Sequence, residues 1–306
     1  MAGVITYINR PKVLMVSMLK RFKHVIPDKA FVRAEYRLKM GRWPDLKNPT
    51  LLSEKIQWLK LFDHNTQYVP LVDKVEAKKH VSKIIGEEHI IPTIGVWRKA
   101  REIDFDALPE QFVLKCNHRG GGVVFICRDK ATFNFKRAKR KLRRQLRKSM
   151  YSSTKEWPYK NVRRRIICEQ YMVDESGCEL KDYKFYCFNG EPKFCQLVSN
   201  RYAESETCKD IYDAEWRLQE FSGPFNAGDT PVNRAEPLPR PENYSQMLEI
   251  AAKLSKGMPF ARIDLYNING VIYFGEITLY PASGMRQFYP LEWNKRIGDW
   301  VTLPKK

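Results

Sequence analysis

The sequence predicts an α+β protein, because patterns typical of β-hairpins alternate with patterns typical of amphipathic helices. Runs rich in β-branched and aromatic residues come in pairs joined by short Gly or Asn-Gly turns. Between these pairs, apolar residues recur at helical spacing. With 306 residues, of which 43% are hydrophobic, the chain is long enough for two or three lobes. The expected units are a basic N-terminal extension, an N-terminal lobe, a small lobe with a glycine loop and a large lobe, at residues 1–45, 46–107, 108–170 and 171–306.

The balance of charge is strongly basic, since 54 Lys and Arg residues against 35 Asp and Glu give a formal net charge of +19. Such a chain attracts nucleic acid, nucleotides, acidic polysaccharide or an anionic membrane surface, and charge alone does not choose among them. The seven cysteines are odd in number and form no C-x-x-C pair. This favours reduced thiols in the cytosol over disulfides or zinc. No run of about 18 apolar residues is present, so no membrane span is expected.

The N-terminal extension contains one short apolar run, Val13–Leu19, which is followed by basic residues rather than by a signal-peptide cleavage site. Val13, Val16 and Leu19, with the lysines that follow, can form a basic amphipathic helix that rests on anionic lipid. A helix that packs against the rest of the protein is an equally good interpretation. The expected location is the cytoplasm, with a peripheral position at the inner face of the membrane as an alternative.

Two buried helices are expected in the N-terminal lobe, at residues 53–62 and 73–81, where apolar side chains cluster at helical spacing. Both are interpreted as scaffold. The sequence Asp104-Phe105-Asp106 follows, a D-x-D motif that metal-dependent glycosyltransferases also use. Its place just before Leu108-Pro109 favours a cap and turn instead.

The stretch Phe112–Cys127 predicts a strand, a glycine loop and a second strand. It lacks the GxxxxGK[ST] pattern and the following helix of a Walker-type loop. The three successive glycines at residues 120–122 can form a mobile flap whose backbone N–H groups approach phosphate oxygens, and Lys115 can reach the same phosphates. A plain flexible turn explains the glycines equally well.

Residues Lys136–Lys148 contain nine basic residues in thirteen, with a narrow apolar stripe. This predicts a helix with a strongly positive outer face. A nucleic-acid patch is one interpretation, but no zinc-finger, RRM or homeodomain pattern accompanies it. An acidic glycan or an anionic membrane accounts for the charge equally well.

Two further strand patterns follow. Arg165–Met172 reads as a buried strand that ends in polar residues, and Lys181–Phe194 reads as a hairpin because Asn189-Gly190 interrupts it. Lys184 projects from the first strand of that hairpin. From the residues alone it can equally be an edge-strand lysine that discourages aggregation.

The segment from Pro259 to Gly284 predicts a terminal hairpin with strands at Phe260–Tyr266 and Val271–Ile277. Its register depends on the loop, because a change of one residue moves every side chain to the other face. We expect a three-residue loop, residues 268–270, since this register collects the apolar side chains on one face. The residues expected on the apolar face are Ala261, Ile263, Leu265, Val271, Tyr273 and Ile277.

In this register Arg262, Asp264 and Glu276 share the opposite face, with Arg262 directly across from Glu276. Two carboxylates at such spacing repel each other unless a cation compensates them. They can share a divalent ion such as magnesium together with substrate phosphates. An ordinary strand pair with a cross-strand Arg–Glu contact is the alternative.

Several segments together resemble the TupA-like (teichuronopeptide biosynthesis) ATP-grasp family of polysaccharide-biosynthesis proteins. They are LSEKIQWLKLFD, LPEQFVLKCNH, EWPYKN, LKDYKFYCFNGEPKF and FARIDLYNINGVIYFGEITLYPASG. The resemblance runs from about Asn48 to the C-terminus. It implies an ATP-grasp fold, with a nucleotide site between two α+β lobes. Residues 108–170 would be the small lobe and residues 171–306 the large catalytic lobe.

The resemblance also implies how ATP is held. Lys115 and Lys184 would bind its phosphates beneath the glycine flap, and the end of the following strand would form the hinge beside adenine. Arg119 and Gly120 follow the loop histidine, where a small residue and Ser are typical of the family. The flap and hinge residues implied to bind nucleotide are Gly120, Gly121, Gly122, Glu169, Gln170, Tyr171 and Met172.

By the same resemblance, Asp264 and Glu276 would ligate magnesium, with Thr278 at the last metal position, where ATP-grasp enzymes often have Asn. Arg262 would face the transferring phosphoryl group or the acyl phosphate, and Lys184 would act with it in catalysis.

The implied activity is ATP- and magnesium-dependent ligation, in which a carboxylate becomes an acyl phosphate and an amine displaces phosphate. The expected substrates are an acidic saccharide, such as a uronic acid of a surface polysaccharide, and a small amine, an amino acid or an amino alcohol. A sugar kinase on the same fold and a glycosyltransferase of a polysaccharide cluster are the alternatives. A nucleic-acid-binding role is the least favoured.

Overall fold

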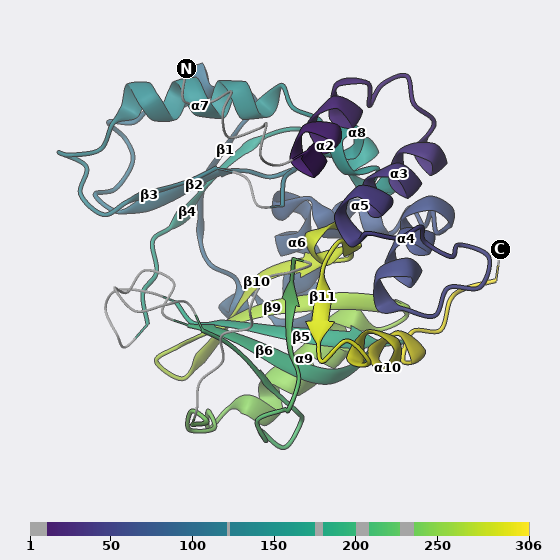
Figure 1. Ribbon diagram of the computed structural model, residues 1–306. Coiled ribbons are helices and arrows are strands. Elements are labelled where there is room, and N and C mark those ends of the chain that lie inside the picture. Colours follow the sequence, from purple (N-terminus) through teal and green to yellow (C-terminus); the bar gives the residue numbers. More distant parts are fainter. Residues whose placement is uncertain (1–10, 121–122, 175–179, 200–207, 227–235, 306) are drawn as a thin grey trace.

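The computed structural model describes residues 11–120, 123–174, 180–199, 208–226 and 236–305. Figure 1 shows two large β-sheets, one above the other, with helices around them, and β8 and β11 form a third, two-stranded sheet. The strands are β1 (Thr93–Trp97), β2 (Phe112–Cys116), β3 (Val124–Cys127), β4 (Ile166–Gln170), β5 (Asp182–Phe188), β6 (Glu191–Ser199), β7 (Cys208–Tyr212), β8 (Ser222–Phe225), β9 (Phe260–Ile268), β10 (Val271–Thr278) and β11 (Gln287–Tyr289). The helices are α2 (Pro11–Arg21), α3 (Asp28–Met40), α4 (Leu52–Phe62), α5 (Tyr68–Val72), α6 (Lys74–Ile85), α7 (Phe135–Leu146), α8 (Met150–Thr154), α9 (Tyr244–Ser255) and α10 (Trp293–Asp299).

The upper sheet has the strand order β1–β4–β2–β3, and its neighbouring strands are antiparallel. The basic helix α7 lies along this sheet (Figure 1). Its two buried side chains, Ala138 and Leu142, are the inward part of the apolar stripe, and Leu142 packs in one cluster with Phe112 and Leu114 of β2. The sequence prediction of a helix with a charged outer face is therefore confirmed, because packing occupies only a narrow side of it.

The lower sheet has the order β10–β9–β5–β6–β7, also with antiparallel pairing. Helix α9 lies beneath it (Figure 1) and buries Met247, Ile250 and Leu254 in the main core of the protein. The β5–β6 turn is formed by Asn189 and Gly190, with φ of 52° and 85°. The Asn-Gly hairpin prediction is confirmed here, because both residues tolerate the left-handed region that this turn requires.

Among the helices before the first strand, α3 contacts α2 and α4, while α5 and α6 contact each other and β10 of the lower sheet. The predicted buried helices at 53–62 and 73–81 are α4 and α6. Of the two interpretations of α2, the packing helix agrees with the half-buried Val16 and Leu19, whereas Met15 and Met18, on the other side of the helix, are exposed. None of the helices in the described ranges has the length and apolar character that a membrane crossing requires. The cysteines found buried as free thiols are Cys116, Cys127, Cys168, Cys187 and Cys195.

The terminal hairpin, β9–β10, differs from the predicted register at its loop. Val271 pairs with Ile268, so the loop has two residues, Asn269 and Gly270, with φ of 51° and 83°. Ile272 and Phe274 are consequently buried, whereas Val271 is 43% exposed. The predicted three-residue loop, and the places of Val271 and Tyr273 on the buried face, were therefore wrong.

A β-bulge between Phe274 and Glu276 corrects the register further along the same strand. Beyond it, Glu276 lies directly opposite Asp264, and Thr278 rather than Glu276 lies opposite Arg262. A Cβ on Gly275 would lie 2.9 Å from the backbone oxygen of Asp264, so glycine is required at this point of close approach. The bulge brings both carboxylates to one face, as the sequence analysis expected for a different reason.

Candidate active site

Three neighbouring strands of the lower sheet place a row of charged side chains side by side. Lys184 of β5 is the cross-strand neighbour of Asp264 of β9, which in turn faces Glu276 of β10. The Nζ atom of Lys184 donates to Oδ2 of Asp264 at 2.7 Å and lies 3.4 Å from Oδ2 of Asp182. Because Asp264 is only 2% exposed, these partners offset the cost of burying its carboxylate.

Arg262 holds both carboxylates of the row. Its Nε and Nη2 atoms donate to the two oxygens of Asp264 at 2.6 and 2.7 Å, a bidentate pair. Nη2 also donates to Glu276 at 3.2 Å and to the hydroxyl of Thr278 at 3.1 Å. The Thr278 hydroxyl donates in turn to Glu276 at 3.1 Å. Arg262 therefore fixes the carboxylate geometry from the side, which is a positioning role.

Lys74, at the first turn of α6, is a site residue that the sequence analysis missed. Its Nζ donates to Oε2 of Glu276 at 2.8 Å. Burial acts to raise the pKa of Glu276, but Lys74 and Arg262 outweigh it and hold that pKa well below its usual range. Asp73 caps the helix by accepting from the N–H of Val75 at 2.9 Å.

The end of β2 is tied to the same helix start. Asn117 donates to Oδ1 of Asp73 at 2.7 Å, and its backbone carbonyl accepts from the N–H of Lys74 at 3.2 Å. Arg165, which precedes β4, forms an ion pair with Asp73 at 2.8 Å. The upper sheet and α6 are thus joined beside the row of charges, and this junction directs Lys74 toward Glu276.

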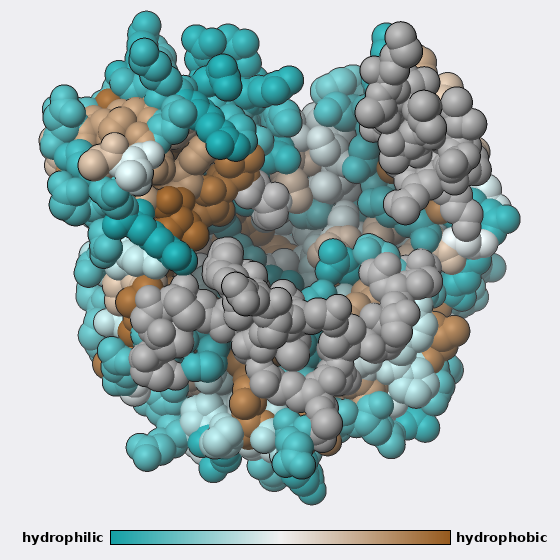
Figure 2. All heavy atoms as spheres, turned by 60° about the vertical axis from the view of Figure 1, so that its left-hand side comes forward, coloured by the Kyte–Doolittle hydropathy of each residue, from teal (hydrophilic) through white to brown (hydrophobic). Residues whose placement is uncertain are grey.

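A cavity of about 230 Å³ opens between the row and the upper sheet. Figure 2 shows a recess at the centre of this face of the molecule. Lys74, Lys115, Arg119 and Lys184 supply cationic walls, while the carboxylates that reach it include Asp264 and Glu276. Cations around a small polar cavity are suited to the oxygens of a phosphate chain.

Arg119 is the second residue that the sequence analysis did not assign to the site. Its Nε and Nη1 atoms are buried, and neither hydrogen-bonds to any group of the described residues. A guanidinium left without acceptors is costly unless a ligand or solvent supplies them. The signal in the sequence was its place just after the loop histidine, where it departs from the pattern of the family.

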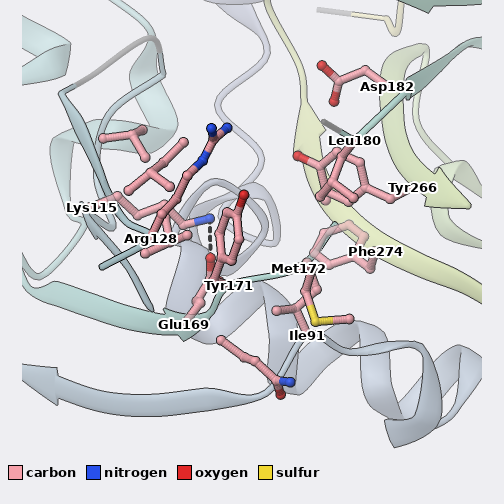
Figure 3. A pocket seen from close by; sticks show the side chains of 15 residues that line it. Ile91, Lys115, Arg128, Glu169, Tyr171, Met172, Leu180, Asp182, Tyr266 and Phe274 are labelled. Carbon is pink, nitrogen blue, oxygen red and sulfur yellow. Dashed lines mark ion pairs between the residues drawn. The ribbon is translucent and has the colours of Figure 1, made fainter. Parts of the chain in front are cut away.

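A second cavity, also of about 230 Å³, continues from the first, since Lys115, Asp182 and Tyr266 line both. Figure 3 shows apolar side chains along one side of it, where Met172 lies between Ile91 and Phe274 and Leu180 lies beyond Phe274. An apolar slot that leads into a cationic cavity matches the two halves of a nucleotide, the base and the phosphates.

The predicted hinge lies at this second cavity. Glu169, the penultimate residue of β4, is the centre of an ion cluster. Its Oε1 accepts from Lys78 at 2.5 Å, and its Oε2 accepts from Lys115, as Figure 3 shows. Burial acts to raise the pKa of Glu169, but the two ammonium groups outweigh it and lower that pKa to about 2. Glu169 therefore orients Lys115, while Gln170, Tyr171 and Met172 line the cavity.

We expect Glu169→Gln to lower the free energy of unfolding by about 3 kcal/mol at neutral pH, because Lys78 and Lys115 lose their buried partner. The folded-state pKa of about 2 lies below the ordinary 4.5, so this stabilisation is full above pH 4.5 and is lost as pH falls toward 2. Urea unfolding of the wild type and the variant between pH 7 and 3 measures the difference in their free energies of unfolding, which should become smaller below about pH 4. Glu110→Gln, at an exposed position, is the control. If Glu169→Gln lowers the free energy of unfolding no more than Glu110→Gln does, the stabilising role of Glu169 is contradicted.

The other predicted site residues are placed as follows. Lys115 lines both cavities, and Gly120 follows β2, where a Cβ would lie 3.9 Å from the methyl carbon of Met150. Gly121 and Gly122 lie outside the described residues. Residues 104–106 form a turn in which Oδ1 of Asp104 accepts from the N–H of Asp106 at 3.1 Å, which confirms the expected turn, although no helix begins there for Asp104 to cap.

The residues present suit a magnesium ion that is shared with a ligand. Among the described residues, no cluster of His, Cys, Asp and Glu forms a complete metal cage. Asp264 and Glu276 nonetheless face each other across β9 and β10 and both line the cavity. Magnesium in nucleotide sites is commonly held by one or two carboxylates together with phosphate oxygens, and this pair supplies that protein share.

The two lobes and the cleft between them define the class: this is an α+β protein of the ATP-grasp fold. The chain belongs to the TupA-like ATPgrasp family, whose model matches residues 54–302. The resemblance noted from the sequence is thereby confirmed.

Solved structures similar to this chain include D-alanine–D-alanine ligases. The enzyme from Helicobacter pylori is 13% identical, with a TM-score of 0.42, over 82% of this chain and 69% of that one. The enzyme from Bacillus anthracis is 17% identical, with a TM-score of 0.38, over 68% of this chain and 57% of that one. A biotin carboxylase from Campylobacter jejuni is 13% identical, with a TM-score of 0.40, over 82% of this chain and 49% of that one. This chain thus spans between 49% and 69% of the length of these three proteins. No curated protein matches it.

Proposed function

We propose that the protein is an ATP- and magnesium-dependent carboxylate–amine ligase. The observation that carries the proposal is the continuous cleft in which an apolar slot opens into a cavity with four cations, Lys74, Lys115, Arg119 and Lys184, and the carboxylates Asp264 and Glu276. Membership of the TupA-like ATPgrasp family supports the same reading.

The reaction would proceed in two steps, phosphorylation of the carboxylate and attack of the amine on the acyl phosphate. An oxygen of the substrate carboxylate attacks the γ-phosphorus of ATP, the bond to the β-phosphate oxygen breaks, and ADP and an acyl phosphate result. The amine nitrogen then attacks the acyl carbon, the bond to the phosphate oxygen breaks, and inorganic phosphate leaves while the nitrogen loses a proton. The products are an amide, ADP and phosphate.

The residues of the cleft meet the needs of this chemistry, which are mainly positioning and neutralisation of charge. Lys115, oriented by Glu169, and Lys184 would hold phosphate oxygens. Asp264 and Glu276 would hold magnesium, which neutralises negative charge on the phosphates when bound. Arg262 keeps the two carboxylates in place and reduces their mutual repulsion.

For the substrates we propose a uronic acid of a surface polysaccharide or its precursor, and an amino acid or amino alcohol. The net charge of +19 supports an acidic acceptor, because it raises the local concentration of anionic saccharides. Nucleic acid is not proposed as a partner.

The test is to incubate the protein with magnesium, ATP and oligosaccharides of glucuronic and galacturonic acid, with and without a mixture of amino acids and ethanolamine. A ligase releases ADP only when the amine is present and yields an amidated saccharide by mass spectrometry. ADP with a phosphorylated saccharide and no need for amine would establish the sugar kinase instead. Transfer of sugar from a nucleotide sugar without ATP consumption would establish the glycosyltransferase.

We expect Arg119→Ala to weaken ATP binding about tenfold, because a charged hydrogen bond to phosphate contributes on the order of 1.5–3 kcal/mol. Affinity for AMP should change less than twofold, since Arg119 lines the cationic cavity and not the apolar slot. Calorimetric titration of each nucleotide with magnesium measures both, with Arg140→Ala on α7 as the control. Equal loss for ATP and AMP would contradict the placement of phosphates beside Arg119.

A further inference from the structure

Helix α2 leaves an apolar face uncovered at the surface of the molecule. Leu14, Met15, Met18 and Phe22 are between 45% and 55% exposed. At 100° per residue these positions fall within about 100° of the helix circumference, so they form one continuous strip. The opposite side of the helix, with Val16 and Leu19, packs toward the protein. Large apolar side chains gathered in this way mark an interaction surface rather than ordinary scatter.

The surroundings of this strip are positively charged. Residues 11–27 contain four Lys and Arg residues and no Asp or Glu. Two acidic side chains of α3 pair with lysines: Asp28 contacts Lys155 at 2.8 Å, and Glu35 contacts Lys39 at 2.8 Å and Lys20 at 3.7 Å. Residues 11–27 carry a net positive charge, since Glu35 is shared between Lys20 and Lys39.

A second basic element lies along the same edge of the molecule. Figure 1 shows α7 and α2 both at the upper edge. The short helix α8, which follows α7, contacts the turn after α2, where Lys23 donates to Ser153 at 3.4 Å. The sequence of α7 contains seven Lys and Arg residues and no acidic residue, and its outward side is exposed.

We propose that this edge docks on an anionic phospholipid bilayer, with the apolar strip of α2 entering the interface and the basic side chains of α7 attracted to the lipid headgroups. An apolar strip flanked by Lys and Arg is the pattern of helices that lie in the membrane interface. A second copy of this chain, which carries a net charge of +19, would bring the basic residues of its own α2 and α7 to this face, and their repulsion opposes self-association. The charged backbone of a nucleic acid offers no apolar surface that would bury the exposed Leu and Met side chains. The bilayer satisfies both the charge and the apolar surface.

The test uses the full chain without nucleotide and measures sedimentation with vesicles of phosphatidylcholine containing 30% phosphatidylglycerol. The expected result is binding that weakens with salt and is at least tenfold weaker to vesicles of phosphatidylcholine alone. Met18→Gln combined with Phe22→Gln should reduce binding at least tenfold. Leu291→Gln, which changes an equally exposed apolar residue elsewhere, should leave it unchanged.

A second variant tests the charged component. Arg140→Gln with Arg143→Gln on α7 should weaken binding several-fold and reduce its salt dependence. Equal binding of wild type and the α2 variant would overturn the proposal, as would equal binding to charged and neutral vesicles. So would a concentration-dependent dimer that the α2 substitutions abolish, because the strip would then serve a second copy. Since ATP is absent throughout, the outcome is independent of the proposed ligase activity.

Discussion

Asp264→Asn is expected to reduce ATP-dependent turnover by about 1000-fold or more, the largest effect of any single substitution in the site. The carboxylate faces Glu276, accepts from Arg262 and Lys184, and lines the cationic cavity. An amide oxygen at this place would hold magnesium poorly and would leave two buried cations without a full counter-charge. The measurement is ADP release at saturating ATP over a range of magnesium concentrations.

The control for this experiment is Asp299→Asn, since Asp299 lies on the exposed side of α10 and pairs only with Lys295 among the residues described. Thermal unfolding of both variants separates loss of fold from loss of chemistry. Turnover by a folded Asp264→Asn protein within a few-fold of wild type would show that the metal and phosphate site lies elsewhere.

Lys184→Met is expected to lower kcat/KM for ATP by about 100- to 1000-fold. The ammonium group lies 2.7 Å from Asp264 and at the wall of the cavity, so its loss removes a cation from the phosphates and a partner from the carboxylate. Methionine keeps a similar length without the charge. Affinity for adenosine should stay within twofold, because the apolar slot is unaltered.

Lys193→Met on the adjacent strand β6 is the matched control, because Lys193 pairs with the exposed Glu191 away from the cleft. Lys184→Arg should recover part of the ATP affinity, since it restores positive charge but not the compact ammonium geometry. Equal losses of affinity for ATP and adenosine would indicate a general loss of structure rather than a missing phosphate contact.

The terminal hairpin shows how far sequence reasoning reaches. Its two strands followed from pattern alone, and so did the expectation that Asp264 and Glu276 share a face, although the predicted loop was one residue too long. The register did not, because the Asn269-Gly270 turn and the bulge at Gly275 change it in opposite senses. A glycine inside a strand pattern signals a bulge, and Gly275 could have been read in that way.

Lys74 and Arg119 could not be assigned in the same manner. Lys74 reaches Glu276 only because Asp73, Asn117 and Arg165 bring α6 against the end of β2, a tertiary junction that no local pattern encodes. Residues from distant parts of the chain meet at the cleft, and composition cannot reveal which lysines among so many will face it. The fold class and the core strands, by contrast, follow from periodicities that are local.

The central claim is that a carboxylate is activated as an acyl phosphate, and transfer of oxygen tests it most directly. Oligogalacturonate labelled with ¹⁸O in its carboxylates is incubated with ATP, magnesium and the amine mixture, and the released inorganic phosphate is analysed by mass spectrometry. The acyl phosphate route predicts one ¹⁸O atom in each phosphate and one retained in each amide. Release of unlabelled phosphate alongside amide, or phosphate retained on a saccharide hydroxyl, would contradict it.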